Sequence, residues 1–594
     1  MDHSLPRAAS HARDFVRNWL HKIDQTFGGD NSSQNTRAAT ASTSNFNGYV
    51  SLPVQGIVLH AGSWLRRHTS SFAAPLWILP SFVTDSLNHK PRAKTSSGNK
   101  ISALDGLRGL CCLMVMHMHW TFALTDSNDG GSWETNMKYL FHRPFWYLLW
   151  AGTSHVNVFF VLSGYVLSVK CLNMVHQGVP AHRFISSAVL RRATRIFLPP
   201  IALMFIYLVA VRLHIFHNSV AIREENSWSQ EFQLRFFEPC PPLYPSFSQQ
   251  FWDVIGATQK LLDPSTHFEL PDYGKYDSHL WTMPTEFYCS LALFLVLVAT
   301  CQLWTRYRVL LHALLVAWCW LTSHQNHGLF FFGLLIAELD ILLKARFRLP
   351  QEPPSSSAVT QNTAKPWASL QARLPIGVAS YFAISNIIST VACFLGLYLL
   401  SMPLLWAEET PGFRGFFHYM PAYMNTGQQG DALRALGAVL TVWPITFTST
   451  ISGDASSTPI INFILCNPVS AYLGQISFAF YLIHGFVIRS LGYSILPSLY
   501  VFVIGSGQRR AELAPTQYMT GQVYAAEARL TARELGTIWV LGYLIVLPTC
   551  IWMADLFHRF IDLKCVALGR AMEEKMIMKD EAAMSLPVAA GKVS

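Results

Sequence analysis

Charged residues are scarce in this chain. Asp, Glu, Lys and Arg make up 13% of its 594 residues, whereas ordinary soluble domains contain about 25%. Hydrophobic residues make up 51%, and they are concentrated in blocks of about 18 to 24 residues, each long enough to cross a bilayer as a helix. This composition argues against a soluble globular protein and predicts one that spans a membrane.

The chain also lacks paired cysteines. Its 11 cysteines form no CxxC pair and no spacing typical of metal ligands, so the sequence supports neither a disulfide framework nor a zinc site. Most of them lie in apolar segments, where a free thiol packs as a small hydrophobic side chain. We therefore predict a protein with no bound metal and no permanently bound cofactor.

An apolar N-terminal run is missing as well. Residues 1–47 are rich in Ser, Thr, Asn, Arg and His, which argues against a secretory signal peptide there. Within a predicted cytosolic tail over 1–100, we expect disorder over about 27–48. The composition of about 49–84 predicts either an interfacial segment lying against the membrane or an ordinary tail packed on the helices.

The apolar blocks predict an all-α polytopic membrane protein, with a transmembrane domain over 101–565 and a cytosolic C-terminal tail over 566–594. We expect about ten transmembrane helices in a bundle. Pro199 and Pro200 fit the first turn of the third helix better than its middle, because proline lacks the N–H that a helix interior needs. The predicted segments are 103–123, 148–171, 194–213, 279–301, 307–323, 327–344, 385–405, 434–453, 469–492 and 537–557.

The charges between these blocks predict an orientation. The segments before the first helix, between the second and third, and between the sixth and seventh are rich in Lys and Arg, whereas 214–278 carries many Asp and Glu. Lys and Arg in short loops favour the cytosolic side. We therefore expect a cytosolic linker over 345–375, a non-cytosolic loop over 214–278, and both termini in the cytosol, in the endoplasmic reticulum or the plasma membrane. The net charge of +9 then needs no nucleic-acid partner.

The first apolar block contains an arginine and a histidine eleven positions apart, Arg108 and His119. Eleven helical steps of about 100° return almost to the same face, with a rise of about 16 Å. Arg108 would then lie at a membrane boundary and His119 about half-way into a core about 30 Å thick. An imidazole at that depth is costly unless it faces a polar cavity, so it indicates a functional site. The alternative is a histidine hydrogen-bonded to a neighbouring helix.

Two more ionisable residues are predicted to lie at a similar depth. Glu286 lies about 10 Å into a helix that descends from the far side, and His484 lies about 22 Å up a helix that rises from the cytosol. Because random burial would scatter such groups, we interpret the three residues from three helices as one catalytic site.

Transfer of an acyl group to an alcohol requires a base, donors for the oxyanion and a place for the donor thioester. His119 is the best candidate base, because imidazole titrates near neutrality. Glu286 could orient His119 or bind the acceptor hydroxyl, or it could simply pair with a buried arginine. His484 and Tyr481 could supply donors, although Tyr481 could equally serve helix packing. Trp281 and Tyr481 are the candidate substrate-binding residues.

Arg108, Arg192 and Arg195 form a second predicted group, on the cytosolic side. Guanidinium groups bind phosphates in a bidentate manner and suit the phosphates of a coenzyme A thioester. The alternative is that they are membrane-flanking arginines that set the topology. Because Arg108 shares a helix face with His119, we favour donor binding, with acyl-CoA as co-substrate and the bilayer and a hydroxyl-bearing acceptor as the other partners.

Several short motifs resemble, in order, those of the acyltransferase 3 family, integral membrane enzymes that move acyl groups onto hydroxyls. The resemblance covers about 101–562 and takes the form seen in fungal members. It implies that acyl-CoA, usually acetyl-CoA, enters from the cytosol and that the arginine-to-histidine motif carries catalysis. The motifs are Arg108 to His119, the FFVLSG-like 157–165, the arginine-rich 191–196, the Trp281-to-Glu286 motif in 280–287, the late helix 473–484 and the final 554–562.

Two departures from the family pattern stand out. Asn157 occupies a position where many members have an acidic residue, so any acid role there is absent. The residues between Trp281 and Glu286 differ from the usual bacterial form and include Pro284. A proline within a membrane helix frees a carbonyl four residues earlier and gives substrate local room.

These observations predict an acyl-CoA-dependent membrane O-acyltransferase, in the first instance an O-acetyltransferase, acting on a carbohydrate, a glycolipid or a secondary metabolite. One alternative is a transporter whose intramembrane charges form a proton or substrate path; no inverted repeat supports it. Another is a different class of membrane acyltransferase, centred on one buried histidine without the Arg108 spacing.

Overall fold

The computed structural model describes residues 78–87, 102–124, 140–224, 238–263, 272–347, 376–452, 463–505, 516–517, 523–524 and 530–576. The contacts divide the chain into two units, 1–73 and 74–594, and every described residue belongs to the second. The predicted disorder over 27–48, most of the predicted interfacial segment and most of the 345–375 linker lie outside the described residues.

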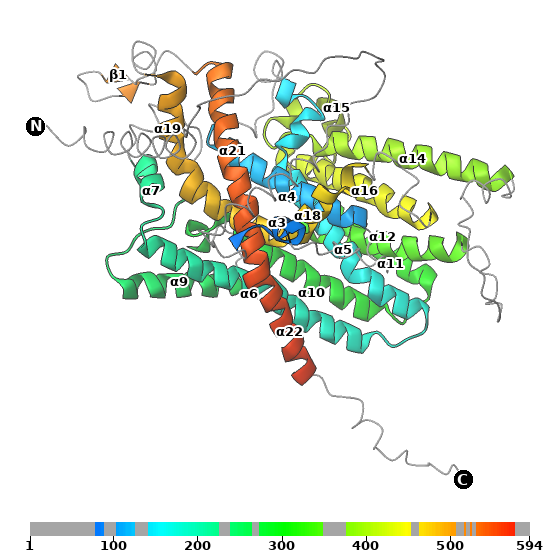
Figure 1. Cartoon of the computed structure of the whole chain (residues 1–594). Helices are drawn as coiled ribbons and strands as arrows, with labels where there is room; N and C mark the ends of the chain where they lie inside the picture. Colours follow the sequence, from blue (N-terminus) through cyan, green and yellow to red (C-terminus); the bar gives the residue numbers. More distant parts are fainter. Residues whose placement is uncertain are drawn as a thin grey trace, which may run out of the picture. The chain divides into compact units, whose positions relative to one another are not determined.

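Helices dominate the described residues (Figure 1). One short antiparallel pairing joins β1 (Thr516–Gln517) to β2 (Val523–Tyr524). The α-helices are α3 Ser81–Leu87, α4 Ser102–Phe122, α5 Gly152–His176, α6 His182–Arg212, α7 His217–Glu224, α9 Phe247–Leu262, α10 Thr282–Thr300, α11 Thr305–Leu321, α12 Gln325–Phe347, α14 Ile376–Leu400, α15 Arg414–Phe417, α16 Thr426–Ser452, α18 Pro468–Val487, α19 Tyr493–Ile504, α21 Ala532–Phe557 and α22 Leu563–Met576. Short 3-10 turns are η2 Leu140–His142, η3 Trp146–Leu149, η5 Asp272–Lys275, η6 Ser278–Trp281 and η7 Ala407–Glu409, and π-helical turns are η9 Ile488–Gly492 and η10 His558–Asp562.

Each of the ten predicted segments overlaps a helix, but the count of ten transmembrane helices is not confirmed. Among the described residues, six helical stretches are long and apolar enough to cross a membrane. Polar residues such as Asp105 and Arg108 interrupt α4, and α11 has only 17 residues. The six stretches are Gly152–His176, His182–Arg212, Ser278–Thr300, Gln325–Leu343, Pro468–Ile504 and Ala532–Met576.

Two of these helices extend beyond their predicted limits. Helix α6 begins at His182 rather than near 194, so Pro199 and Pro200 lie inside it and the expectation that they mark its first turn is wrong. Apolar periodicity located only the hydrophobic part of α6, whereas its basic first turns are also helical. Neighbouring helices can satisfy the backbone groups that a proline leaves free. Helices α21 and α22 are joined by η10, so the helix continues past 565.

Helices α4 and α18 pack with their backbones almost in contact. A Cβ atom built on Gly109 would lie 2.4 Å from the backbone nitrogen of Gly474, and one on Gly474 would lie 2.3 Å from the carbonyl oxygen of Asp105. Small residues allow such close approach between helices in a membrane. This contact places the two helices that carry His119 and His484 side by side.

Helix α18 begins at a defined cap, which fixes the positions of the residues that follow. Asn467 Oδ1 accepts hydrogen bonds of 2.9 Å from the backbone N–H groups of Val469 and Ser470, and Pro468 occupies the first helical turn. Asn is a favoured N-cap and Pro a favoured first helical residue.

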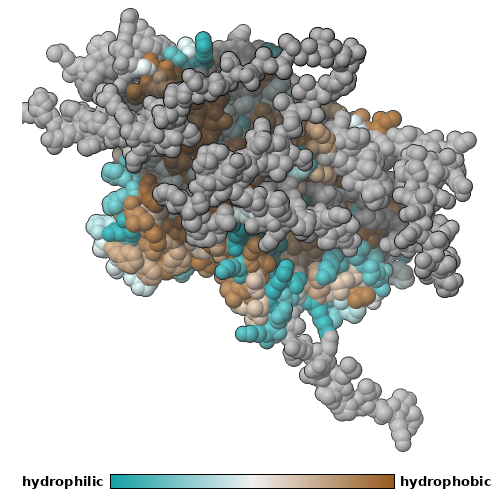
Figure 2. Space-filling view, in the orientation of Figure 1, coloured by the Kyte–Doolittle hydropathy of each residue, from teal (hydrophilic) through white to brown (hydrophobic). Residues whose placement is uncertain are grey.

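Hydrophobic side chains remain exposed on the outside of the bundle, as Figure 2 shows in brown. They include Leu295 on α10, Leu314 and Trp318 on α11, and Phe394 on α14. Hydrophilic residues gather instead at the lower edge of that view, around α22. Apolar outer faces are those expected of helices that contact lipid.

Candidate functional site

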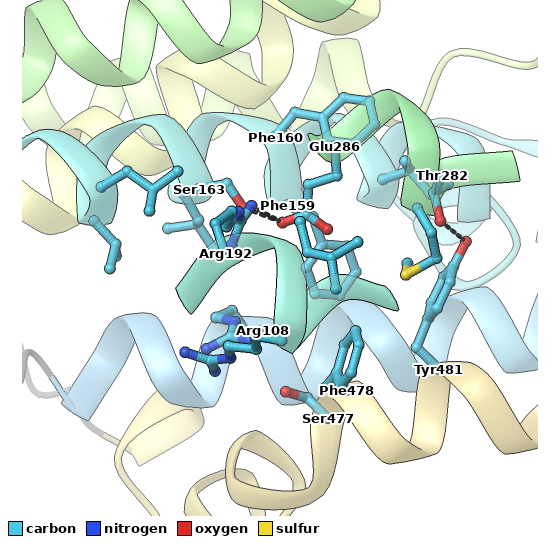
Figure 3. Close-up of a pocket in the computed structure, with 17 residues that line it drawn as sticks. Arg108, Phe159, Phe160, Ser163, Arg192, Thr282, Glu286, Ser477, Phe478 and Tyr481 are labelled. Carbon is cyan, nitrogen blue, oxygen red and sulfur yellow. Dashed lines mark hydrogen bonds and ion pairs between the residues drawn. The ribbon is translucent and has the colours of Figure 1, made fainter. Parts of the chain in front are cut away.

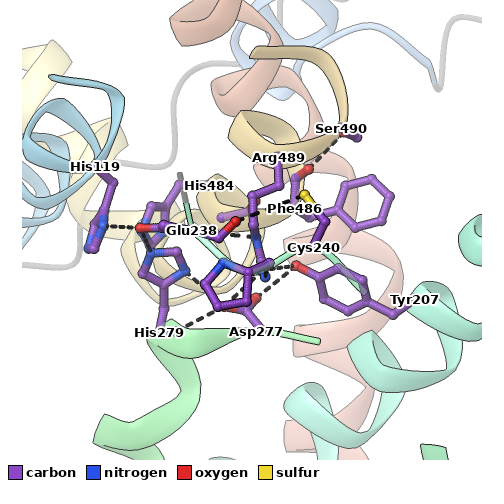
Figure 4. Close-up of polar contacts among 12 residues, drawn as sticks. His119, Tyr207, Glu238, Cys240, Asp277, His279, His484, Phe486, Arg489 and Ser490 are labelled. Atoms are coloured by element: carbon purple, nitrogen blue, oxygen red, sulfur yellow. Dashed lines mark hydrogen bonds and ion pairs between the residues drawn. The ribbon is translucent and has the colours of Figure 1, made fainter. Parts of the chain in front are cut away.

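Three histidines from three elements lie together inside the bundle (Figure 4). His119 comes from the last turn of α4, His279 from η6 and His484 from the end of α18. Their ring centroids are separated by 4.0 Å for His119 and His279, 4.4 Å for His279 and His484, and 5.3 Å for His119 and His484. The structure therefore brings together two predicted site residues, His119 and His484, and adds His279.

Two buried carboxylates hold these rings. Glu238 Oε1 lies 2.6 Å from His119 Nδ1 and 3.1 Å from His279 Nε2. Asp277 Oδ1 lies 2.8 Å from His279 Nδ1. The side chain of Glu238 is 3% exposed and that of Asp277 is fully buried. We refer to His119, His279, His484, Glu238 and Asp277 as the histidine cluster.

A buried arginine compensates the carboxylates. The guanidinium of Arg489, which is fully buried, lies 3.2 Å from Asp277 Oδ1 and 3.9 Å from Glu238 Oε2. The hydroxyl of Tyr207 donates to Asp277 Oδ2 at 2.9 Å. Burial opposes ionisation of Asp277, but the charges of Arg489 and His279 outweigh it and lower the pKa of the carboxyl to about 2. For Glu238, burial is likewise outweighed by His279 and His119, which hold its pKa well below the usual range.

The hydrogen-bond partners favour one protonation state for each ring. An ionised carboxylate only accepts hydrogen bonds, so both ring nitrogens of His279 carry protons and the ring is an imidazolium. Its charge and that of Arg489 then balance Glu238 and Asp277 without any contribution from His119. We therefore interpret His119 as the neutral ring, which donates its Nδ1–H to Glu238 and keeps a lone pair on Nε2. This is the tautomer that a general base requires.

His484 is held differently. Its Nδ1 lies 2.5 Å from the carbonyl oxygen of Tyr481, which can only accept, so Nδ1 carries the proton. Its Nε2 is buried and has no hydrogen-bond partner among the described residues. A neutral His484 therefore presents an acceptor, and the predicted donor role would require a protonated ring.

The three histidines are also close enough to hold a metal ion. One ring nitrogen from each lies within 4.8 Å of one from each of the others. However, Nδ1 of His119 and both nitrogens of His279 already face carboxylate oxygens. An ion ligated by all three rings would have to displace Glu238 or Asp277 from His279, so these contacts favour a proton-holding cluster.

The second group of candidate residues lines a pocket shown in Figure 3, which we call the inner pocket. It encloses about 960 Å³ of space, including the part open to solvent. Its walls come from α4, α5, α6, α10 and α18, and they contain the predicted Arg108, Arg192, Arg195, Glu286 and Tyr481 together with Ser163, Phe159 and Phe478. The structure thus unites the three predicted donor-binding arginines.

Glu286 faces the inner pocket rather than His119. Its Oε1 accepts a 2.5 Å hydrogen bond from Arg192 Nη2 and a 2.9 Å hydrogen bond from Ser163 Oγ. Of the roles considered for Glu286, pairing with a buried arginine is the one that matches this contact. The carboxylate that hydrogen-bonds to His119 and orients its ring is Glu238. Glu238 lies in the predicted loop 214–278 and was not among the predicted site residues.

Tyr481 connects the two sites. It lines the inner pocket, accepts a 2.9 Å hydrogen bond from Thr282 Oγ1 and donates to the carbonyl oxygen of His279 at 3.1 Å. Its own carbonyl oxygen accepts from His484. The side chain therefore stands between the arginines and the histidine cluster. Trp281, the other predicted substrate-binding residue, is not among the residues that line the pocket.

One family model matches most of the chain. Residues 101–554 match the family model of acyltransferase 3, described as an acyltransferase domain. The chain is 26% identical to the O-acetyltransferase PaAT-1 of Phomopsis amygdali over 526 residues, which cover 84% of this chain and 89% of that protein.

Two further relatives are less similar. Acyltransferase R4 of a Phoma species is 23% identical over 68% of this chain and 86% of that protein. Acyltransferase clz18 of Cochliobolus lunatus is 23% identical over 67% of this chain and 84% of that protein. No solved structure matches the chain.

Proposed function

Because the chain belongs to the acyltransferase 3 family, we propose that it is a membrane O-acyltransferase that moves an acyl group, in the first instance acetyl, from acyl-CoA to a hydroxyl. The acceptor is a carbohydrate, a glycolipid or a secondary metabolite. The observation that carries this proposal is the hydrogen bond between His119 and Glu238, one tyrosine away from a pocket lined by three arginines. The name of the O-acetyltransferase PaAT-1 supports acetyl as the group transferred.

In the proposed reaction, Nε2 of His119 accepts the proton of the acceptor hydroxyl as its oxygen attacks the thioester carbonyl. Glu238 stabilises the imidazolium that forms. The carbon–sulfur bond then breaks, and His119 returns the proton to the leaving thiolate. The acyl group passes directly to the acceptor, without an acyl-histidine intermediate. Nε2 of His484 accepts a hydrogen bond from the bound acceptor.

The arginines serve the donor in this proposal. Arg108, Arg192 and Arg195 bind phosphates of acyl-CoA, and the thioester end extends along the inner pocket toward Tyr481. The bias of Lys and Arg supports entry of the donor from the cytosol, with both termini on the same side. Tyr481 must move, or the thioester must pass beside it, for the carbonyl to meet His119.

The test compares two histidines of the same helix. Membranes with the wild-type chain should release coenzyme A from acetyl-CoA in the presence of a cell extract that contains the acceptor, and His119→Ala membranes should not. His117→Ala is the matched control, because His117 is also a buried histidine of α4 but lies beside Tyr543, away from the cluster.

A comparison of metabolites should reveal the acceptor as a mass increase of one acetyl group that depends on His119. Wild-type membranes that transport a solute but consume no thioester, with transport unaffected by His119→Ala, would overturn the proposal and support the transporter alternative.

A further inference from the structure

A second pocket adjoins the inner pocket, and we call it the outer pocket. It encloses about 990 Å³, including the part open to solvent, and shares Val166, Leu167, Arg192 and Arg195 with the inner pocket. Helices α5, α6 and α22 form its walls. The outer pocket is strongly basic, with Lys170, Arg191, Arg192, Arg195 and Arg570 in its lining and no Asp or Glu.

Only part of this positive charge is compensated. Arg191 Nη1 pairs with Glu573 at 2.8 Å, and Arg192 pairs with Glu286. Within the described residues, the other three cations, Lys170, Arg195 and Arg570, form no ion pair with a carboxylate. Five cations line this space and only two of them form an ion pair with a carboxylate, so it favours a ligand that carries several negative charges.

The outer pocket has firm walls. A Cβ atom built on Gly569 of α22 would lie 2.5 Å from Thr194 Oγ1 of α6, so the two helices are in close contact there. One turn further along α22, Glu573 accepts hydrogen bonds from Ser187 and Arg191 of α6. These contacts hold the face of α22 that contributes Val566, Gly569 and Arg570. The hydrophilic residues around α22 in Figure 2 belong to this end of the molecule.

We propose that the outer pocket binds the nucleotide end of the donor, a 3′-phosphorylated adenosine diphosphate. Lys170 and Arg570 join the three arginines of the proposed function at its phosphates, and the pantetheine arm extends past Arg192 into the inner pocket. This inference rests on the proposed function and adds to it two residues, Lys170 and Arg570, and the helix α22. The two pockets share lining residues, so one donor molecule can place its phosphates in the outer pocket and its thioester in the inner pocket.

The experiment compares two donors. Lys170→Ala and Arg570→Ala should each raise the KM for acetyl-CoA about tenfold, the factor expected from loss of one charge-assisted hydrogen bond. Neither should change the KM for S-acetyl-N-acetylcysteamine, a thioester without a nucleotide. Lys564→Ala is the matched control, since Lys564 is an exposed cation of α22 outside the outer pocket.

Other results would overturn the assignment. If both variants kept the wild-type KM for acetyl-CoA, the nucleotide would not bind in the outer pocket. If activity fell equally with both donors, Lys170 and Arg570 would have a structural role. The two variants would also be compared in vesicles of different lipids. A rise in KM that occurs with phosphatidylglycerol but not with neutral phosphatidylcholine would show that the outer pocket binds a lipid headgroup phosphate.

Failure of the proposed function has a different outcome. If the wild-type protein consumes neither thioester, calorimetric titration with coenzyme A still tests the outer pocket. Binding that weakens about tenfold in Arg570→Ala would support the pocket although the acyl transfer had failed. Absence of coenzyme A binding to the wild-type protein would overturn both.

Discussion

In the histidine cluster, the charges of Glu238 and Asp277 are balanced by Arg489 and by the imidazolium of His279. In the lining of the outer pocket, three cations form no ion pair with a carboxylate of the described residues. The cluster is complete without a ligand, so it can keep His119 neutral in the resting state. Cations outnumber carboxylates in the lining of the two pockets, and a phosphate-bearing ligand would supply the missing negative charge. The proposed reaction thus uses a charge-balanced cluster, whereas donor binding uses an excess of positive charge. Tyr481 lies between the two sites.

The largest effect should come from the carboxylate that orients the base. Glu238→Gln preserves shape but removes the charge that holds the His119 tautomer and stabilises the imidazolium. We expect kcat to fall by about 10²- to 10⁴-fold, the usual contribution of general base catalysis. The KM for acetyl-CoA should stay near the wild-type value, because the donor pockets are untouched. Steady-state kinetics in membranes measure both, and a raised KM at unchanged kcat would contradict the role of Glu238.

Loss of the compensating cation should mainly affect stability. Arg489→Met leaves Asp277 and Glu238 buried without their guanidinium, and breaking a buried ion pair costs about 3–5 kcal/mol. Unfolding of the detergent-solubilised protein by denaturant measures this change. Adding Asp277→Asn to Arg489→Met should restore part of the loss, since one unpaired charge is removed. A single variant as stable as the wild type would show that the cluster is not balanced by Arg489.

On the pocket side, Arg192→Ala combined with Arg195→Ala should raise the KM for the donor by about 10- to 100-fold, as expected for the loss of one or two charge-assisted contacts. The decrease in kcat should be smaller, because neither arginine contacts the histidine cluster. Initial rates over a range of acetyl-CoA concentrations separate the two constants. Loss of kcat at an unchanged KM would refute donor binding by these arginines.

The smallest effect is expected for Glu286→Gln. Glutamine can still accept the hydrogen bond of Ser163, whereas Arg192 becomes free to meet an anion. The KM for acetyl-CoA should therefore decrease, by less than about tenfold because the pair is partly exposed to solvent. The same kinetic assay measures it. A collapse of kcat would instead place Glu286 in the chemistry, as its position in the family motif suggested.

Periodicity and composition located helices at all ten predicted segments, because burial in lipid imposes a long apolar run on each span. The count of ten membrane-crossing helices is not confirmed: among the described residues, α4 carries Asp105 and Arg108, and α11 is short. Helix geometry also indicated that Arg108, Arg192 and Arg195 belong together and that His119 and His484 reach a similar depth.

The parts of the site that were missed depend on tertiary contacts. Glu238 lies in a loop, and no periodic pattern reports where a loop docks on a bundle. Its position is set by a hydrogen bond from its backbone N–H to Tyr493 and by one from Arg489 to the carbonyl oxygen of Pro239. Arg489 carried a usable signal, because an arginine five residues after His484 in an apolar helix requires a buried partner.

The docking of Glu238 has a consequence for biogenesis. The histidines of α4 and α18 are in place once those helices have inserted, but the carboxylate that holds His119 arrives with a separate, non-helical segment. A newly made chain whose segment at Glu238 has not yet docked on η9 and α19 would have an unoriented base. Arg489 and Tyr493 lie far later in the sequence than Glu238, so His119 is oriented only once that late part of the chain has been made and folded.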